Sequence, residues 1–199
     1  MRTIRRVLWI SFVICLGGYG AAWGFSGTGK ANIFDPGQLK PIDSTLNVRV
    51  GESAPDFSLP SVAGETVTLS QFQGRKNVVI SFVPAAWTPV CSDQWPGYNI
   101  VQSLFEDNEA ILLGITVDNI PTLYAWTRQM GDLWFPVLSD FWPHGKVAER
   151  YGVLRSDGVS ERALFVIDKA GILRAIHVAD INVRPDLEWC VIELEKLAP

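Results

Sequence analysis

The sequence predicts an α/β protein in which a mixed central sheet carries helices on both faces. Apolar segments at 78–83 and 111–117 are typical of strands buried on both sides. Each is followed by helix-start signals, and strands that alternate with helices indicate parallel pairing. The segments 163–168 and 172–178, on either side of Lys169-Ala170-Gly171, predict a β-hairpin that adds antiparallel strands.

The remaining elements are weaker predictions from turn residues, caps and short apolar runs. In chain order we first expect a small hairpin from Val62 to Leu69 across Ala63-Gly64, closed by Gln71–Gly74, and then a helix after Thr88 that Pro96 and Gly97 kink before it continues over Tyr98–Asp107. A second helix should be capped by Asn119 or Asp118 and run to about Met130. An extended piece at Pro136–Leu138, a helical turn at Lys146–Tyr151 stopped by Gly152, and a last helix opened by Pro185 should follow.

Cys91 lies where the first apolar strand gives way to a helix. Pro84 ends the strand, because proline cannot donate to a sheet ladder. Thr88 followed by Pro89 is a helix start: the threonine oxygen can cap free N–H groups, and proline at the first helical position loses no hydrogen bond. The pattern therefore places Cys91 at the third helical position, at the carboxyl end of its strand, where α/β sheets hold their sites.

The helix start favours a reactive sulfur. Unpaired N–H groups and the positive end of the helix dipole both stabilise a thiolate over a thiol. The alternative is that Cys91 is a small buried hydrophobe, the usual fate of a lone cysteine. Strand, proline, threonine and helix start all converge on this one residue, so we favour the nucleophile.

Composition excludes several classes of function. The chain has 199 residues, 48% of them hydrophobic, enough for one domain and an appendage. Without residues 1–25 it keeps 14 basic against 21 acidic residues, so nucleic acid is not an expected partner. None of the three cysteines forms a CxxC or CxxH pair, and His144 and His177 lie 33 residues apart. We therefore expect no metal site.

The amino terminus predicts membrane targeting. Residues 1–6 include three arginines, and residues 7–25 carry no charge, which is just long enough to span a bilayer as an apolar helix. A cleaved signal peptide remains open, because Gly20-Ala21-Ala22 offers a cleavage site. Both interpretations put the domain at the extracytoplasmic face of the membrane or in the periplasm. Residues 26–48 are then expected to be a linker and 49–199 the domain.

From about Val48 to Leu197 the chain resembles the peroxiredoxins, a family with the thioredoxin fold. Pro84-Ala85-Ala86-Trp87-Thr88-Pro89-Val90-Cys91 fits their specific PxxxTxxC motif. The opening Gly51-x-x-Ala54-Pro55-Asp56-Phe57 fits theirs too, although other thioredoxin-like families share it. Residues 162–168 fit the arginine-bearing strand of the family.

The resemblance implies roles for individual residues. Cys91 would be the peroxidatic cysteine, Arg162 the guanidinium beside it, and Gln94 the residue that orients this arginine. Trp126 resembles a tryptophan often found near the pocket, although tryptophan is more often a core residue.

The same roles follow from the chemistry of peroxide reduction. A thiolate attacks one oxygen while charge builds on the other, so the site needs donors along the O–O axis. Arg162 can stabilise the thiolate and hold one oxygen, unless it is only a surface charge. The Thr88 hydroxyl and the Cys91 N–H can hold the other oxygen, and Pro84 would exclude water.

The expected function is a thiol peroxidase that acts on hydrogen peroxide or organic hydroperoxides without a cofactor, in an antioxidant role. A membrane-tethered thiol–disulfide oxidoreductase is the alternative within the fold, but Cys91-Ser92-Asp93-Gln94 lacks its second cysteine. A non-catalytic thioredoxin-like binding module is a third interpretation. A homodimer is left open.

The return of oxidised Cys91 to the thiol depends on whether another cysteine can react with its sulfenic acid. Cys15 lies in the apolar terminus, and Cys190 lies on the apolar stripe of the last helix, so burial is expected to keep Cys190 from resolving a sulfenic acid. We therefore expect a one-cysteine mechanism with an external thiol or a thioredoxin-like reductant.

Overall fold

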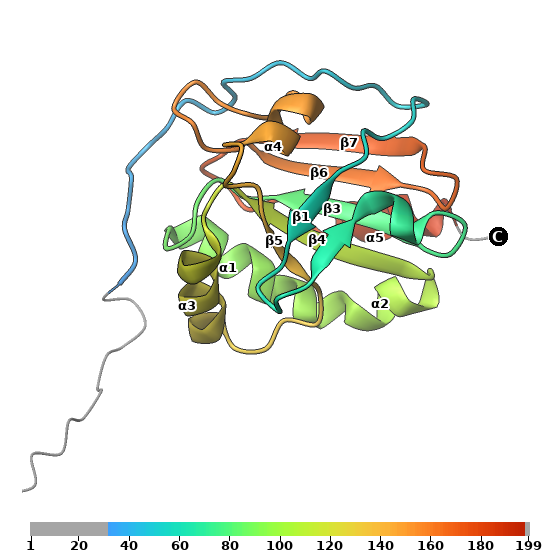
Figure 1. Ribbon diagram of the computed structural model, residues 1–199, viewed down its shortest axis with the longest axis horizontal. Helices are drawn as coiled ribbons and strands as arrows, with labels where there is room; N and C mark the ends of the chain where they lie inside the picture. Colours follow the sequence, from blue (N-terminus) through green and yellow to red (C-terminus); the bar gives the residue numbers. More distant parts are fainter. Residues whose placement is uncertain (1–31, 198–199) are drawn as a thin grey trace, which may run out of the picture.

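The computed structural model describes residues 32–197. Its strands are β1 (Ser58–Pro60), β2 (Thr66–Thr68), β3 (Asn77–Phe82), β4 (Ala110–Thr116), β5 (Val137–Ser139), β6 (Arg162–Ile167) and β7 (Leu173–Ala179). Its helices are α1 (Pro89–Gly97), α2 (Gln102–Asp107), α3 (Ile120–Met130), α4 (Lys146–Tyr151) and α5 (Leu187–Glu195), with 3₁₀ turns at Leu69–Phe72 and Tyr98–Val101 (Figure 1). The predicted alternation of strands and helices is confirmed.

One sheet organises the molecule. Its strand order is β5-β4-β3-β6-β7, with β3 in the middle (Figure 1). The pairs β3–β4 and β4–β5 are parallel, whereas β3–β6 and β6–β7 are antiparallel. The mixed sheet is therefore confirmed, with parallel strands on one side of β3 and the antiparallel hairpin on the other.

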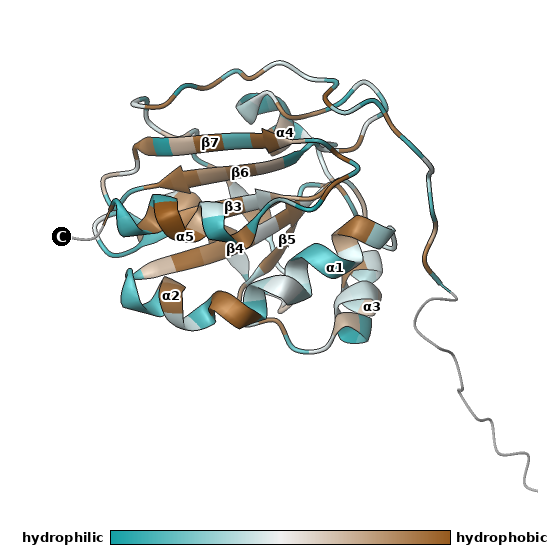
Figure 2. Ribbon diagram, turned by 180° about the vertical axis from the view of Figure 1, so that it is seen from behind, coloured by the Kyte–Doolittle hydropathy of each residue, from teal (hydrophilic) through white to brown (hydrophobic). Residues whose placement is uncertain are grey.

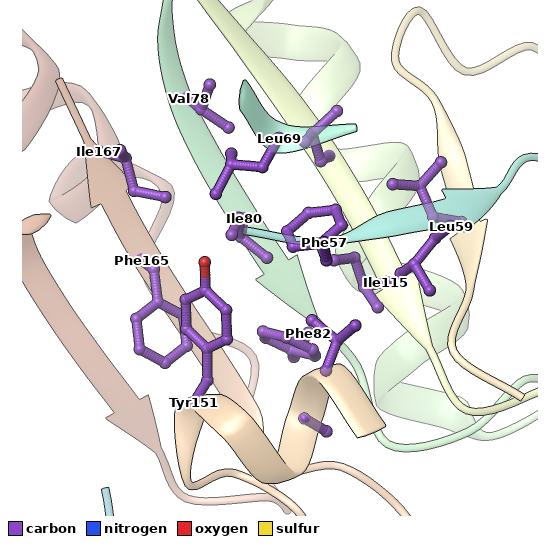
Figure 3. Packing of buried hydrophobic residues seen from close by; sticks show 14 of the residues in the cluster. Phe57, Leu59, Leu69, Val78, Ile80, Phe82, Ile115, Tyr151, Phe165 and Ile167 are labelled. Atoms are coloured by element: carbon purple, nitrogen blue, oxygen red, sulfur yellow. The ribbon is translucent and has the colours of Figure 1, made fainter. Parts of the chain in front are cut away.

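Different elements cover the two faces of this sheet. Because side chains alternate along a strand, Val78, Ile80 and Phe82 point to one face, where they pack with the β1–β2 hairpin and α4 (Figure 3). Val79 and Val83 point to the opposite face, which α1, α2, α3 and α5 cover (Figure 2). Helices lie on both faces, as predicted, and all six residues of β3 are buried.

The first hairpin starts earlier than the sequence indicated. Its strands are β1 and β2, paired with Leu59 opposite Val67, and Ser61–Glu65 form the turn. The turn closes through a hydrogen bond from Gly64 N to Ser61 O, and Gly64 has a φ of 92°. Leu59 and Val67 are the buried members of the pair, so burial of these two side chains sets the register.

The helices begin at the predicted residues except for the last one, which begins two residues later than predicted. Asn119 Oδ1 accepts a hydrogen bond from Thr122 N at 3.0 Å and opens α3, as predicted. The last helix begins at Leu187 rather than at Pro185, because the Asp186 carboxylate caps it through Glu188 N. Pro96 stands inside α1, and a 3₁₀ turn separates α1 from α2, which confirms the interruption predicted there.

The stretch expected to be a linker lies against the domain from about residue 34 onward. Asp43 N donates to Glu161 Oε1 at 2.6 Å, Asn47 N donates to Tyr151 O at 3.3 Å, and Val48 is buried in the core. In Figure 1 this blue segment passes along the edge of the sheet before it enters β1. It shows no apolar period because hydrogen bonds, rather than a buried stripe, hold it in place.

Among residues 32–197, no helix has the length and apolar character needed to cross a bilayer. The arginine-flanked stretch 1–25, for which we predicted targeting, lies outside the described residues.

Candidate active site

Cys91 is the third residue of α1 and is fully buried as a free thiol. Thr88 occupies the N-cap position with extended backbone, and Pro89 is the first helical residue, as predicted. The Thr88 hydroxyl does not cap the helix, however; it donates to Ala85 O at 3.0 Å. The expected capping bond is therefore absent, which leaves the N–H groups of the first helical turn without that side-chain acceptor.

Arg162 is the first residue of β6 and reaches Cys91 through the pairing of two strands. Ala163 lies opposite Phe82, so Arg162 stands beside the carboxyl end of β3, where the chain turns toward α1. Its side chain is buried, and Nη2 lies 3.5 Å from Cys91 Sγ. The topology thus brings together two residues 71 positions apart.

The guanidinium group of Arg162 is held by neutral acceptors. Nη1 donates to Gln94 Oε1 at 2.5 Å, while Nε and Nη2 donate to Ile181 O at 3.1 and 3.0 Å. Within residues 32–197 no carboxylate lies at ion-pair distance from it. The buried guanidinium therefore places a positive charge next to the Cys91 sulfur.

Gln94 is itself fixed from behind. Its Nε2 donates to Ser81 Oγ at 3.2 Å and to Tyr98 Oη at 3.3 Å, and all three side chains are buried. Burial raises the pKa of the Tyr98 hydroxyl above its ordinary value, so it stays neutral. The sequence pointed to Gln94 but not to its two partners; the only signal for Ser81 was a hydroxyl within an apolar strand.

The loop between β3 and α1 has its own supports, which the sequence analysis also missed. Asp118 Oδ2 accepts hydrogen bonds from Ala86 N at 2.8 Å and from Thr116 Oγ1 at 2.6 Å. On the other side, Ser160 Oγ donates to Val83 O at 2.8 Å. These bonds hold the backbone that leads to Cys91.

A cavity of about 680 Å³ opens in front of these residues. Pro84, Thr88 and Arg162 line it, which places three of the predicted site residues at one surface. Cys91 and Gln94 are not among the lining residues; Cys91 lies behind them against Arg162. The far wall is formed by residues 34–39 of the amino-terminal segment.

Trp126 and Cys190 belong to the core rather than to this cavity. Trp126 is buried with its ring centroid 5.0 Å from that of Trp95, and its Nε1 donates to Ser92 Oγ at 3.0 Å. Trp126 thus does not line this cavity; it lines a separate, smaller cavity beside Pro89 and Ser92. Cys190 is fully buried in α5, as predicted, and burial raises the pKa of its thiol to about 12. In the described part of the chain, no cluster of three or more His, Cys, Asp or Glu residues could hold a metal.

Within residues 32–197, a buried cysteine at a helix start, an arginine with no carboxylate at ion-pair distance and a cavity in front form the arrangement expected of a thiol-based peroxidase on an α/β fold of thioredoxin type. Residues 50–176 match the AhpC/TSA family. The chain belongs to this family, and the prediction that it is an enzyme of peroxiredoxin type is confirmed.

Individual relatives agree. Alkyl hydroperoxide reductase E of Mycobacterium tuberculosis is 40% identical over 128 residues, which cover 64% of this chain and 83% of that protein. The chloroplastic 2-cysteine peroxiredoxin of Chattonella marina var. antiqua is 33% identical over 161 residues, covering 76% and 82%.

Solved structures share the fold. Reduced 2-Cys peroxiredoxin of Plasmodium vivax superposes with a TM-score of 0.69 at 28% identity, covering 74% of this chain and 81% of that one. Mycobacterium tuberculosis AhpC superposes with a TM-score of 0.70 at 23% identity, covering 75% and 93%. At that identity, the AhpC match shows the fold alone.

Proposed function

We propose that this protein reduces hydrogen peroxide and organic hydroperoxides through Cys91. The Cys91 thiolate attacks one peroxide oxygen, the S–O bond forms as the O–O bond breaks, and the leaving oxygen takes a proton and departs as water or an alcohol. Cys91 is oxidised to a sulfenic acid and the peroxide is reduced. The observation that carries the proposal is the 3.5 Å contact between Cys91 Sγ and an Arg162 guanidinium that no carboxylate neutralises within residues 32–197.

The neighbouring residues have separate parts in this step. Arg162 stabilises the thiolate and donates to the peroxide, and Gln94 orients its guanidinium. The Thr88 hydroxyl already donates to Ala85 O, so its oxygen is oriented to accept the hydrogen of the hydroperoxide. The Cys91 N–H holds the oxygen under attack, and Pro84 shields the sulfur from water.

We propose a one-cysteine route for the return to the thiol. A first external thiol condenses with the sulfenic acid, releasing water and forming a mixed disulfide with Cys91. A second thiol then reduces that disulfide and restores the Cys91 thiol. Burial of Cys190 supports this route, since a thiol fixed in the core cannot reach Cys91 without local unfolding.

We further propose that residues 1–25 anchor or export the protein, so that the domain works at the extracytoplasmic face of the membrane. The arginines before the apolar stretch motivate the orientation. A reporter that is active only outside the cytoplasm, fused after Pro199, should be active. A reporter active only in the cytoplasm would reverse the orientation.

The reaction is tested by peroxide consumption with the full-length protein and a small thiol donor. Cys91→Ser should abolish turnover, whereas the matched variant Cys190→Ser should keep it. Equal rates for wild type and Cys91→Ser would reject the proposal. Insulin reduction, measured in parallel, would instead reveal a disulfide reductase.

A further inference from the structure

The segment from Phe34 to Leu39, here called the strap, crosses the cavity in front of Cys91. At one end, Phe34 N donates to Trp87 O at 2.7 Å in the loop before α1. At the other end, Leu39 N donates to Asn182 Oδ1 and Leu39 O accepts from Asn182 Nδ2, both at 2.9 Å. The strap is therefore fastened on both sides of the cavity.

The second attachment of the strap lies in the turn whose carbonyl accepts hydrogen bonds from Arg162. Ile181 O accepts two hydrogen bonds from Arg162, and Ile181 N donates to Pro41 O at 3.1 Å. Asn182, the next residue, holds Leu39. The position of the strap is thus tied to the residues that hold the guanidinium.

The cavity is larger and less polar than hydrogen peroxide requires. It measures about 680 Å³, whereas a water-sized molecule occupies roughly 30 Å³. Apolar side chains line both walls: Phe34, Pro36 and Leu39 from the strap; Pro84, Ala86 and Val90 from the opposite side. Phe34 is 69% exposed, so this aromatic ring is available to contact a bound molecule.

We propose that the strap is the specificity-determining wall of the site and binds the apolar organic group of a hydroperoxide while Arg162 and Thr88 hold its O–O group. This inference rests on the proposed peroxidase function and extends it to residues outside the catalytic motif. An organic group placed between the strap and Pro84 buries apolar surface on both sides, which hydrogen peroxide cannot do.

The test compares two peroxides on the full-length protein. In the double variant Phe34→Ala with Leu39→Ala, the second-order rate constant for oxidation of Cys91 by cumene hydroperoxide should fall about tenfold, since lost apolar contacts in a pocket typically have effects of this size. The rate constant with hydrogen peroxide should stay within about twofold of wild type, because Arg162 and Thr88 are untouched. The matched control carries Leu46→Ala and Phe141→Ala, both exposed and outside the cavity, and should change neither rate constant.

Two results would overturn the role of the strap. An unchanged ratio of the two rate constants in the double variant would show that the strap does not contact the organic group. An equal fall with both peroxides would show that it acts on the fold or on Arg162 instead. Failure of the proposed function gives a different result, namely a wild-type protein in which neither peroxide oxidises Cys91.

Discussion

The guanidinium of Arg162 lies 3.5 Å from the sulfur of Cys91 and is surrounded otherwise by neutral acceptors. The arginine keeps its charge at any pH a protein survives, so the contact puts a fixed positive charge beside the sulfur that attacks the peroxide in the proposed reaction. The same group is a forked donor aimed at the space in front of the sulfur. In the proposed reaction, one side chain thus supports the nucleophile and stabilises the charge that develops on the peroxide.

Replacing Arg162 with methionine should therefore slow the oxidation of Cys91 by hydrogen peroxide by roughly 10²–10³, the usual effect of removing one donor to a reacting oxygen. Methionine keeps much of the buried volume, and Arg162→Lys serves as the control that keeps the charge but not the fork. Stopped-flow tryptophan fluorescence measures the rate, and absorbance at 240 nm measures the thiolate. A rate near wild type in Arg162→Met would remove this arginine from the site.

Gln94 is expected to act as a positioning residue through Arg162. In Gln94→Leu the Nη1 group loses its 2.5 Å acceptor inside the core, so the guanidinium should shift and oxidation should slow about tenfold. Gln94→Asn keeps a neutral amide acceptor and should recover part of the rate. Absorbance at 240 nm against pH separates this role from a purely structural one: the thiolate fraction should fall in Gln94→Leu and recover in part in Gln94→Asn. Identical thiolate curves for the two variants would contradict the assignment.

Local sequence patterns sufficed to predict the chemistry-bearing stretch. The strand before Cys91, the proline that ends it and the Thr88-Pro89 start of α1 all depend on side-chain type, which a sequence displays. The contact between Cys91 and Arg162 depends on the pairing of β3 with β6, which no local pattern shows. Only the resemblance of residues 162–168 to the arginine-bearing strand of the peroxiredoxins indicated this contact.

The missed parts depend on backbone atoms or on distant contacts. Ile181 holds Arg162 through its carbonyl oxygen, which every residue has, so no side-chain pattern could reveal it. The strap contains Gly, Pro and Asp and has no apolar period, and a flexible linker has the same composition. Asp118 was considered only as a helix cap, because the amide of Ala86 that it binds lies 32 residues away.

Asp118 should control the order of the loop before Cys91. Asp118→Ala removes the acceptor of Ala86 N and of the Thr116 hydroxyl, and hydrogen bonds to a charged group contribute about 1.5–3 kcal/mol to the free energy of unfolding. Chemical denaturation should show a loss of this order, together with slower oxidation of Cys91. Asp107→Ala, at an exposed residue of α2, is the matched control and should change neither. Equal unfolding curves for the two variants would count against the role of Asp118.

The last prediction concerns whether Cys190 can react at all. Burial raises the pKa of its thiol to about 12, so at pH 8 only about one molecule in 10⁴ carries a Cys190 thiolate, the form that reacts. The thiolate fraction of Cys190 falls as the pH is lowered, and it becomes substantial only when the pH is raised toward about 12. Iodoacetamide at pH 8 should therefore modify Cys91 but not Cys190 in the folded protein, and both in urea.

The same burial bears on the catalytic cycle. Mass spectrometry after one equivalent of hydrogen peroxide, without added thiol, should show one extra oxygen on Cys91 and an unmodified Cys190. Cys190→Ala should then turn over with a small-thiol donor at close to the wild-type rate, because this buried side chain contacts Tyr98 rather than Cys91 or Arg162. A rapidly formed, stoichiometric disulfide between Cys91 and Cys190, within one chain or between two, would mean that α5 opens during the cycle and that the one-cysteine route is wrong.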